Sequence, residues 1–229
     1  MSVLRSDDRI RNEQRDCEGW FTFHPDSREP LAVGFGALMM LNEYVLPAKA
    51  QVPNRLIEGA ALITYVKSGI LSCRDSFGRQ STCRTGEFSH TAGLRNIHYS
   101  ETNASSEDTD IVQLYLRRIE GAKTPSREQR RFSVADRRGR WCVVASSDGR
   151  DGSLTVGSDA VVYSSILEVG HHVIHELPAT NRAWLHLLRG HVMLNNIVAL
   201  KGGDGVGVVA GPVSLTAQAE TESLLIVTT

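Results

Sequence analysis

The feature of this 229-residue chain that most constrains its fold is an internal repeat of one β-strand pattern. The stretch "ALITYVKSGILSCRD", from Ala61, and the stretch "AWLHLLRGHVMLNN", from Ala183, each read as an apolar strand, a basic or polar pair, one glycine and a second strand. A Gly-acid turn follows at a similar distance in both, as "TGE" (85–87) and "GGD" (202–204). Because the repeat spans about half the chain, we expect two copies of one β fold and not a solenoid.

Short apolar runs separated by turn signals occur along most of the chain, and helical periodicity is nearly absent. The runs lie at 61–66, 69–73, 110–116, 141–146, 160–167, 183–188, 192–195, 205–209 and 223–227. Strands this short and this regularly spaced predict an all-β sandwich or barrel. A strand, a Gly turn, a second strand and a Gly-acid turn are typical of the cupin barrel, so we expect an all-β bicupin of two tandem jelly-roll barrels.

The repeat also predicts where the domains lie. We expect an N-terminal barrel over residues 1–120, a basic linker over 121–139 and a C-terminal barrel over 140–229. The stretch "SREQRRFSVADRRGR" (126–140) carries six arginines against two acids. We interpret it as a solvated linker, with a partner-binding patch as the alternative.

Composition excludes several classes of function. A formal charge of −1, with 41% hydrophobic and 22% charged residues, is ordinary for a soluble domain and gives no attraction to nucleic acid or anionic lipid. The first residues are charged and lack an apolar h-region, and no apolar run is long enough to span a membrane. We therefore expect a cytoplasmic monomer or weak dimer whose partner is a small molecule or a protein, with no membrane or nucleic-acid partner.

A set of motifs in this order and spacing resembles the pirin family of bicupins. The motifs are "VGFGALMMLNE" (33–43), "LITYVKSG" (62–69), "RDSFG" (74–78), "GEF" (86–88), "YSETN" (99–103), "REQRRF" (127–132) and "SSDGRDGSL" (146–154). The resemblance covers nearly the whole chain and implies a metal site in the N-terminal barrel. In the family a His-x-His pair and a His-x-Glu pair usually hold iron there, and some bacterial members are similar to quercetin 2,3-dioxygenases.

At the positions that match these pairs, three of the four expected ligands are replaced. Gapless alignment from "LITYVKSG" places the first pair on Arg55 and Ile57, and alignment from "GEF" places the second on Tyr99 and Glu101. A guanidinium stays protonated and an isoleucine has no donor atom, so neither can ligate a divalent metal. Arg55, Tyr99 and Glu101 could instead form a polar set in the former metal cavity. In this respect the chain looks similar to the YhaK-type pirin-like proteins, which lack these histidines.

Two further residues are weaker candidates for lining this remnant pocket, namely Tyr65 and His98. His98 and Glu101 are three residues apart, so they face opposite sides of a regular strand, and a bulge would be needed to bring them together. His90 is the next nearest histidine, and none lies between it and His24 on the strand that should supply the first pair.

The remaining histidines are interpreted as structural. His171 and His175 of "GHHVIHE" share a face of a strand but stand roughly 13 Å apart, at about 3.3 Å per residue, and His172 points the other way. His186 and His191 flank a glycine turn in different strands and receive the same interpretation. We therefore expect no metal in the C-terminal barrel.

The four cysteines lack CxxC spacing: Cys17, Cys73, Cys83 and Cys142. If "DSFG" (75–78) closes a hairpin centred on Phe77, Cys73 lies opposite Ser81 and too far from Cys83 for a relaxed disulfide.

Three hypotheses about function remain. The favoured one is a pirin-like protein without a cofactor that binds a small molecule or a partner in a regulatory or stress-related role. The alternatives are a quercetin 2,3-dioxygenase-type enzyme using iron or another divalent metal, and a cysteine-based redox-responsive regulator.

Overall fold

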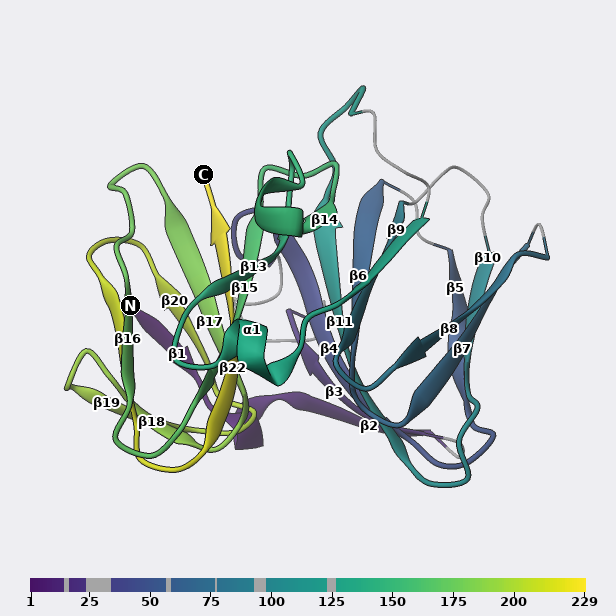
Figure 1. Ribbon diagram of the computed structural model, residues 1–229, viewed down its shortest axis with the longest axis horizontal. Helices are drawn as coiled ribbons and strands as arrows, with labels where there is room; N and C mark the ends of the chain where they lie inside the picture. The colour runs from purple at the N-terminus through teal and green to yellow at the C-terminus, as the bar shows by residue number, and fades with distance from the viewer. Residues whose placement is uncertain (15–16, 24–33, 57–58, 77, 93–97, 123–126) are drawn as a thin grey trace.

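The computed structural model describes residues 1–14, 17–23, 34–56, 59–76, 78–92, 98–122 and 127–229, with backbone alone for 12–14, 53–56 and 98–99. The regular structure is almost entirely β-strand, arranged as two barrels side by side (Figure 1). Each barrel has a seven-stranded inner sheet, which faces the other barrel, and a four-stranded outer sheet. The all-β bicupin predicted from the repeat is confirmed. None of the described helices is long and apolar enough to cross a membrane.

The N-terminal barrel is built mainly from the first half of the chain. Its inner sheet has the order β12 (Arg127–Arg131), β9 (Glu87–Ala92), β6 (Ala60–Ser68), β11 (Thr109–Arg117), β4 (Leu38–Leu46), β3 (Cys17–Thr22) and β2 (Ile10–Gln14). Its outer sheet has the order β5 (Gln51–Leu56), β10 (His98–Asn103), β7 (Ile70–Asp75) and β8 (Gln80–Arg84).

The C-terminal barrel has the same arrangement. Its inner sheet has the order β1 (Ser2–Leu4), β20 (Gly205–Val208), β17 (Arg182–Arg189), β22 (Thr221–Thr228), β15 (Val161–Leu167), β13 (Cys142–Ser146) and β14 (Leu154–Thr155). Its outer sheet has the order β16 (His172–His175), β21 (Val213–Ala217), β18 (His191–Leu194) and β19 (Val198–Lys201). Short helical turns are η1 (Ser6–Asp8), α1 (Val134–Arg137) and η3 (Arg150–Gly152).

The repeated glycines occupy equivalent turns in the two barrels. Gly69 joins β6 to β7 with a φ of 90°, and Gly190 joins β17 to β18 with a φ of 87°. A Cβ atom at either position would come within 2.2 Å of the start of the neighbouring inner strand, at Thr109 Oγ1 of β11 in one barrel and at the carbonyl oxygen of Glu220, just before β22, in the other. Both the backbone conformation and the close approach therefore require glycine.

Three apolar clusters fill the molecule, one inside each barrel and one between the inner sheets. In β11, Ile111 and Tyr115 belong to the N-terminal barrel core, while Val112 and Leu114 belong to the cluster between the sheets. Trp184 of β17 joins that same central cluster from the other barrel. The inner sheets are therefore apolar on both faces, which explains the near-continuous hydrophobic runs of their central strands.

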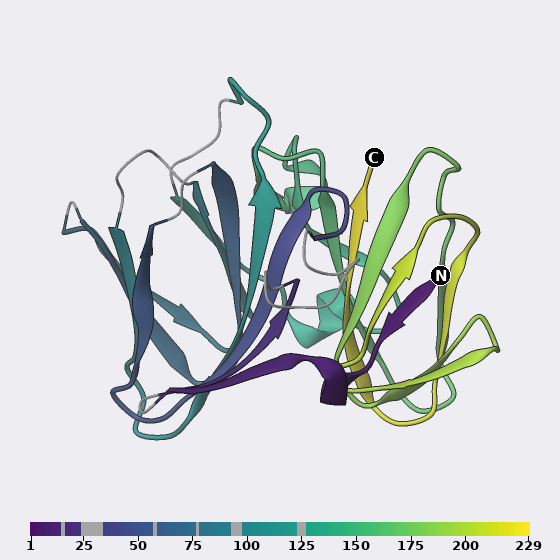
Figure 2. The same cartoon turned by 180° about the vertical axis from the view of Figure 1, so that it is seen from behind.

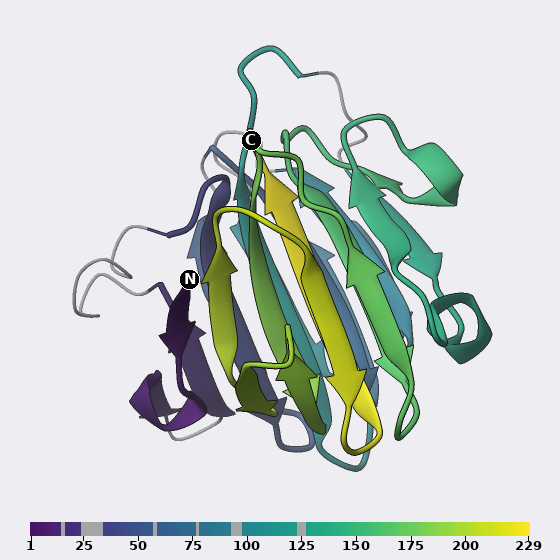
Figure 3. The ribbon, with the colours of Figure 1, turned by 90° about the vertical axis from the view of Figure 1, so that its left-hand side faces the viewer.

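Two segments depart from the expected domain boundaries. Residues 1–120 were expected to form the N-terminal barrel, yet β1 pairs with β20 of the C-terminal inner sheet, with Val3 opposite Val206. The purple strand β1 lies beside the yellow-green β20 in Figure 3, and the chain then crosses through η1 to β2 of the other barrel (Figure 2). Each long inner sheet leaves an edge with unpaired backbone groups, and a strand from outside the barrel covers it.

The basic segment 121–139 is also not a simple solvated linker. Residues Arg127–Arg131 form β12, which pairs with β9 at the edge of the N-terminal inner sheet. The helix α1 follows, begun by a capping box in which the Ser133 side chain accepts a hydrogen bond from the Asp136 N–H. Arg137 of this helix is buried. The arginines of this segment are thus divided between a strand edge, the protein interior and the surface.

Candidate functional site

A band of buried polar side chains crosses the interior of the N-terminal barrel. Glu101, on β10 of the outer sheet, is only 2% exposed. Its carboxylate accepts a hydrogen bond from Thr64 Oγ1 at 3.1 Å through Oε1 and one from Gln113 Nε2 through Oε2. Thr64 and Gln113 lie opposite each other on β6 and β11 of the inner sheet, so the contacts tie the two sheets together.

The orientation of the Gln113 amide follows from its second partner. Tyr115 donates its hydroxyl hydrogen to Gln113 Oε1 at 3.1 Å, so the NH₂ group is the end directed at Glu101. Cys73, which pairs with Glu101 across the ladder of β7 and β10, places its Sγ 4.0 Å from Oε1. Two uncharged donors, Thr64 and Gln113, thus orient the buried carboxylate.

The backbone register brings two of the predicted pocket residues to adjacent positions. Tyr99 of β10 lies directly opposite Arg55 of β5. Between Tyr99 and Glu101 the pairing with β5 is irregular, because two steps along β10 correspond to three along β5, from Arg55 to Val52. The side chains of Arg55, Tyr99 and His98 lie outside the described part of the structure, and so does the whole of Ile57. Their joint pocket therefore stays a prediction.

The same register tests whether β10 contains the bulge that would bring positions 98 and 101 to one face of the strand. Over Tyr99–Asn103, β10 pairs regularly with β7, with Tyr99 opposite Asp75 and Glu101 opposite Cys73. The extra residue of the irregular pairing thus belongs to β5 and not to β10. No bulge within this part of β10 joins the two positions.

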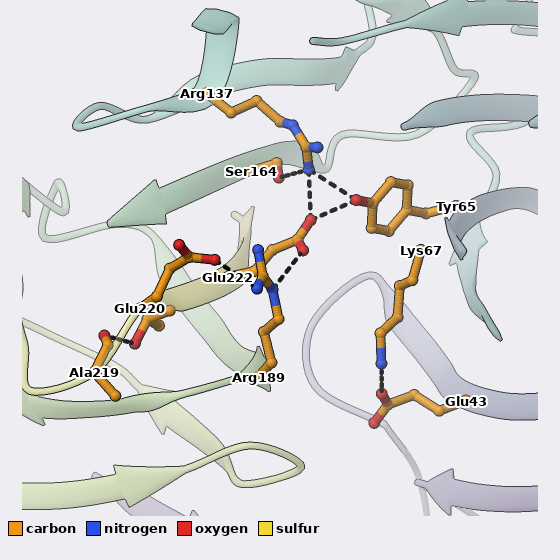
Figure 4. A network of polar contacts seen from close by, with 10 residues as sticks. Glu43, Tyr65, Lys67, Arg137, Ser164, Arg189, Ala219, Glu220 and Glu222 are labelled. Carbon is orange, nitrogen blue, oxygen red and sulfur yellow. Dashed lines mark hydrogen bonds and ion pairs between the residues drawn. The ribbon is translucent and has the colours of Figure 1, made fainter. Parts of the chain in front are cut away.

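Tyr65 was expected to line the N-terminal pocket, and this expectation is wrong. Its neighbour Thr64 faces the barrel interior, so Tyr65 faces the layer between the two inner sheets. There the phenol donates a hydrogen bond to Glu222 Oε1 at 2.5 Å (Figure 4). Arg137 Nη1 donates to the same carboxylate oxygen at 2.6 Å, to the phenol oxygen at 3.0 Å and to Ser164 Oγ at 3.2 Å.

A second buried carboxylate, Glu43 of β4, also lies between the inner sheets. His186 Nε2 lies 2.9 Å from Glu43 Oε1, Arg9 Nη1 lies 2.5 Å from it, and Lys67 Nζ lies 3.4 Å from Oε2. Burial opposes ionisation of Glu43, but these neighbours outweigh it and hold the pKa of Glu43 below its usual range. Burial also lowers the pKa of His186, so we assign the compensating charge to Arg9 and Lys67, with His186 a neutral donor.

These two acidic centres were missed at the level of sequence. The available signal was one carboxylate within each apolar strand, Glu43 in "MLNEYVL" and Glu222 in "TESLLIV". A buried acid needs a partner, but nothing local indicates that one partner of each comes from the other half of the chain, His186 for Glu43 and Tyr65 for Glu222. His186, interpreted as structural, is placed in one of these clusters.

Burial disfavours the thiolate form of two of the four cysteines, Cys83 and Cys142. Cys73 pairs with Ser81, and Cys83 pairs with Leu71, as the hairpin register predicted. Cys73 and Cys83 are both buried, and burial raises the pKa of Cys83 to about 12. Burial likewise raises the pKa of Cys142. The thiolate is the reactive form, so these shifts work against a thiol-based switch.

The geometry also bears on metal binding. In the part of the chain that the structure describes, no three histidine, cysteine or acidic side chains come together as a metal-binding group. His90 is buried and faces the layer between the barrels, opposite Ile63, and not the barrel interior. His175 packs against Tyr163 with ring centroids 4.8 Å apart.

Two tandem cupin barrels packed through their inner sheets define the chain as a bicupin. Residues 4–116 match the family described as Pirin, and residues 143–227 match the quercetinase C-terminal cupin domain. The chain belongs to the pirin family.

Individual relatives support this assignment. The chain is 30% identical to the quercetin 2,3-dioxygenase of Escherichia coli K12 over 91% of its own length and 90% of the relative's. It is 25% identical to the pirin-like protein YhaK of the same organism, over 86% and 85%. The crystal structure of the bacterial pirin YhhW from Escherichia coli in complex with nickel(II) superposes with a TM-score of 0.89 at 29% identity, covering 99% of this chain and 98% of that one. Overall identity is thus somewhat higher to the dioxygenase than to YhaK, whereas the expected likeness to YhaK rests on the missing histidines at the family's ligand positions.

Proposed function

We propose that the N-terminal barrel binds a small molecule without a catalytic metal, as part of a non-catalytic, regulatory bicupin. The observation that carries this proposal is the state of Glu101, the one ligand position of the family motif that keeps its residue. Both of its carboxylate oxygens accept hydrogen bonds from uncharged side chains, Thr64 and Gln113. The carboxylate of Glu101 thus serves as a hydrogen-bond acceptor inside the barrel, which supports a role other than metal ligation.

The residues at the other ligand positions do not fit a divalent metal. Position 55 carries an arginine and position 57 an isoleucine, and neither can donate an electron pair to a metal. Position 99 carries a tyrosine, whose phenol is protonated at neutral pH unless strongly perturbed. We therefore derive no reaction step through a metal. An ionised Glu101 is acceptor-only, so a ligand reaching it would present hydroxyl or amino hydrogens.

A dioxygenase is the second candidate, and a specific observation favours it. The relative that is 30% identical over most of both chains is a quercetin 2,3-dioxygenase, and a closely superposing pirin structure holds nickel(II). This candidate requires ligands other than the expected pairs. The redox-regulator candidate has less support, since the pKa of Cys83 is raised.

The experiment combines metal analysis with quercetin as a hydroxyl-bearing probe. The protein is purified without chelator, incubated with iron(II), nickel(II) or manganese(II), desalted and analysed for metal by mass spectrometry. Oxygen uptake and quercetin binding are then measured on the same samples. Glu101→Gln keeps the shape of the side chain but removes its charge, and Glu107→Gln is the control at an exposed glutamate of the adjoining turn.

We expect metal far below one ion per chain in wild type and both variants, and no oxygen uptake. A polyphenol bound through the barrel should bind more weakly to Glu101→Gln than to Glu107→Gln. Stoichiometric metal that is lost in Glu101→Gln, together with oxygen uptake, would establish the dioxygenase instead.

A further inference from the structure

A cavity of about 560 Å³ opens between the two barrels, away from the interior of the N-terminal barrel. The N-terminal half contributes Gly34, Gly36 and Arg117 to its lining, and the C-terminal half contributes Asp159 and Arg182. Its volume lies in the usual range for small-molecule sites, which occur preferentially where two domains meet. The cavity is not used by the function proposed above.

The turn that precedes β4 forms one wall of this cavity, and its glycines permit the close approach of the two barrels. A Cβ atom on Gly36, where φ is 61°, would lie 2.0 Å from Thr228 Oγ1 of β22 and 3.3 Å from Arg182 Cδ. Figure 2 shows the start of β4 beside the C-terminal end of β22. Because Arg117 N–H donates to the Ala37 carbonyl at 2.8 Å, the end of β11 is held against the same turn.

The charges that line the cavity are unbalanced. Arg117, Arg118 and Arg182 line it, against Asp159 and the terminal carboxylate of Thr229. The Asp159 carboxylate already accepts a hydrogen bond from Thr229 Oγ1 at 2.6 Å. Among the described residues, Arg117 and Arg182 have no ion-pair partner, whereas exposed arginines elsewhere often do, as Arg189 does with Glu220.

We propose that this cavity, the inter-barrel arginine cleft, binds a small organic anion through a carboxylate or phosphate group held between Arg117 and Arg182. The planar guanidinium group matches both oxyanions with paired hydrogen bonds. Ile119, exposed at the rim, and Ala37 offer apolar surface to the body of the ligand. Since both barrels supply contacts, binding of the anion should stabilise the packing of the two barrels and so the folded protein.

The test measures anion binding by the full-length chain at constant ionic strength. Inorganic phosphate, citrate and benzoate are the probes, with chloride as the reference salt, and thermal unfolding and titration calorimetry are the two measurements. The variants are Arg117→Gln and Arg182→Gln, each at an exposed side chain that can change without disturbing the core. Arg84→Gln, at an exposed arginine of the outer sheet, is the matched control.

At least one probe should raise the unfolding temperature of wild type and of Arg84→Gln above the chloride reference. Loss of one charge-assisted contact should raise the dissociation constant of that probe roughly tenfold or more in Arg117→Gln and in Arg182→Gln. Stabilisation by phosphate alone would identify phosphorylated ligands, and stabilisation by citrate or benzoate would identify carboxylates. Absence of stabilisation by all three probes, or equal affinity in wild type and both cleft variants, would overturn the proposal.

Discussion

His90 provides a stability test of the layer between the barrels. Its side chain is fully buried on β9, and neither ring nitrogen has a hydrogen-bond partner among the described residues. Burial lowers the pKa of His90 to about 4, Arg118 pushes it in the same direction, and Glu128 partly opposes the shift. The perturbation is His90→Leu, which replaces the imidazole by an apolar side chain of similar size.

The size of the effect on the free energy of unfolding follows from the difference between the pKa of His90 in the folded and in the unfolded state. The ordinary pKa of histidine is 6.5, so between pH 6.5 and pH 4 the unfolded chain binds a proton that the folded chain does not. The stability contributed by neutral His90 is therefore complete above pH 6.5 and is lost as the pH falls toward 4. At about 1.4 kcal/mol per pKa unit, this one side chain accounts for about 3 kcal/mol of the decline.

The assay is urea unfolding of wild type and His90→Leu at a series of pH values from 7 down to 4. The free energy of unfolding of wild type should fall more steeply than that of His90→Leu, and the two curves should diverge by about 3 kcal/mol across the window. At pH 7 the variant should be no less stable, since it removes an unpaired buried polar group. His172→Leu, at an exposed histidine of β16, should keep the wild-type slope. Parallel curves for wild type and His90→Leu would refute the reasoning.

Two further predictions concern the same fold. Glu222→Ala should lower the free energy of unfolding by about 3–5 kcal/mol, because it leaves Arg137 buried without its carboxylate. Tyr65→Phe, which removes one hydrogen bond to that carboxylate, should lower the free energy of unfolding by about 1–2 kcal/mol. Both variants are measured by urea unfolding at pH 7, and equal losses in the two would contradict a central role for Glu222. Alanine at Gly69 or Gly190 should each cost more than about 1 kcal/mol by thermal unfolding, since φ is positive at both and a Cβ atom would come within 2.2 Å of a neighbour. A neutral effect at either glycine would argue against the equivalence of the two turns.

Much of the local structure was predictable because it depends on neighbours in sequence. Gly86 and Gly203 both have a positive φ, as expected for glycines in the repeated Gly-acid turns at 85–87 and 202–204. The pairing of Cys73 with Ser81 follows from the length of one hairpin loop. Such features are decided within a few residues, where turn chemistry and strand alternation act directly.

The candidate sites were harder to predict because the inner sheets are buried on both faces. Strand alternation shows that Thr64 and Tyr65 point to opposite sides, but not which side encloses the barrel and which meets the other barrel. Glu101 was predicted in the N-terminal barrel and is buried there, whereas Tyr65 was assigned to the wrong face.

By itself, the sequence determined the class of fold, the duplication and the replacement of metal-ligating residues at positions 55, 57 and 99. Only the tertiary structure decided that β1 and β12 cover the edges of the two inner sheets, that Glu43 and Glu222 each find one partner in the opposite barrel, and that arginines from both halves meet in one cleft. The physical reason is that these contacts join segments far apart in the chain. Their free energy depends on how two complete sheets pack, and no local pattern records that packing.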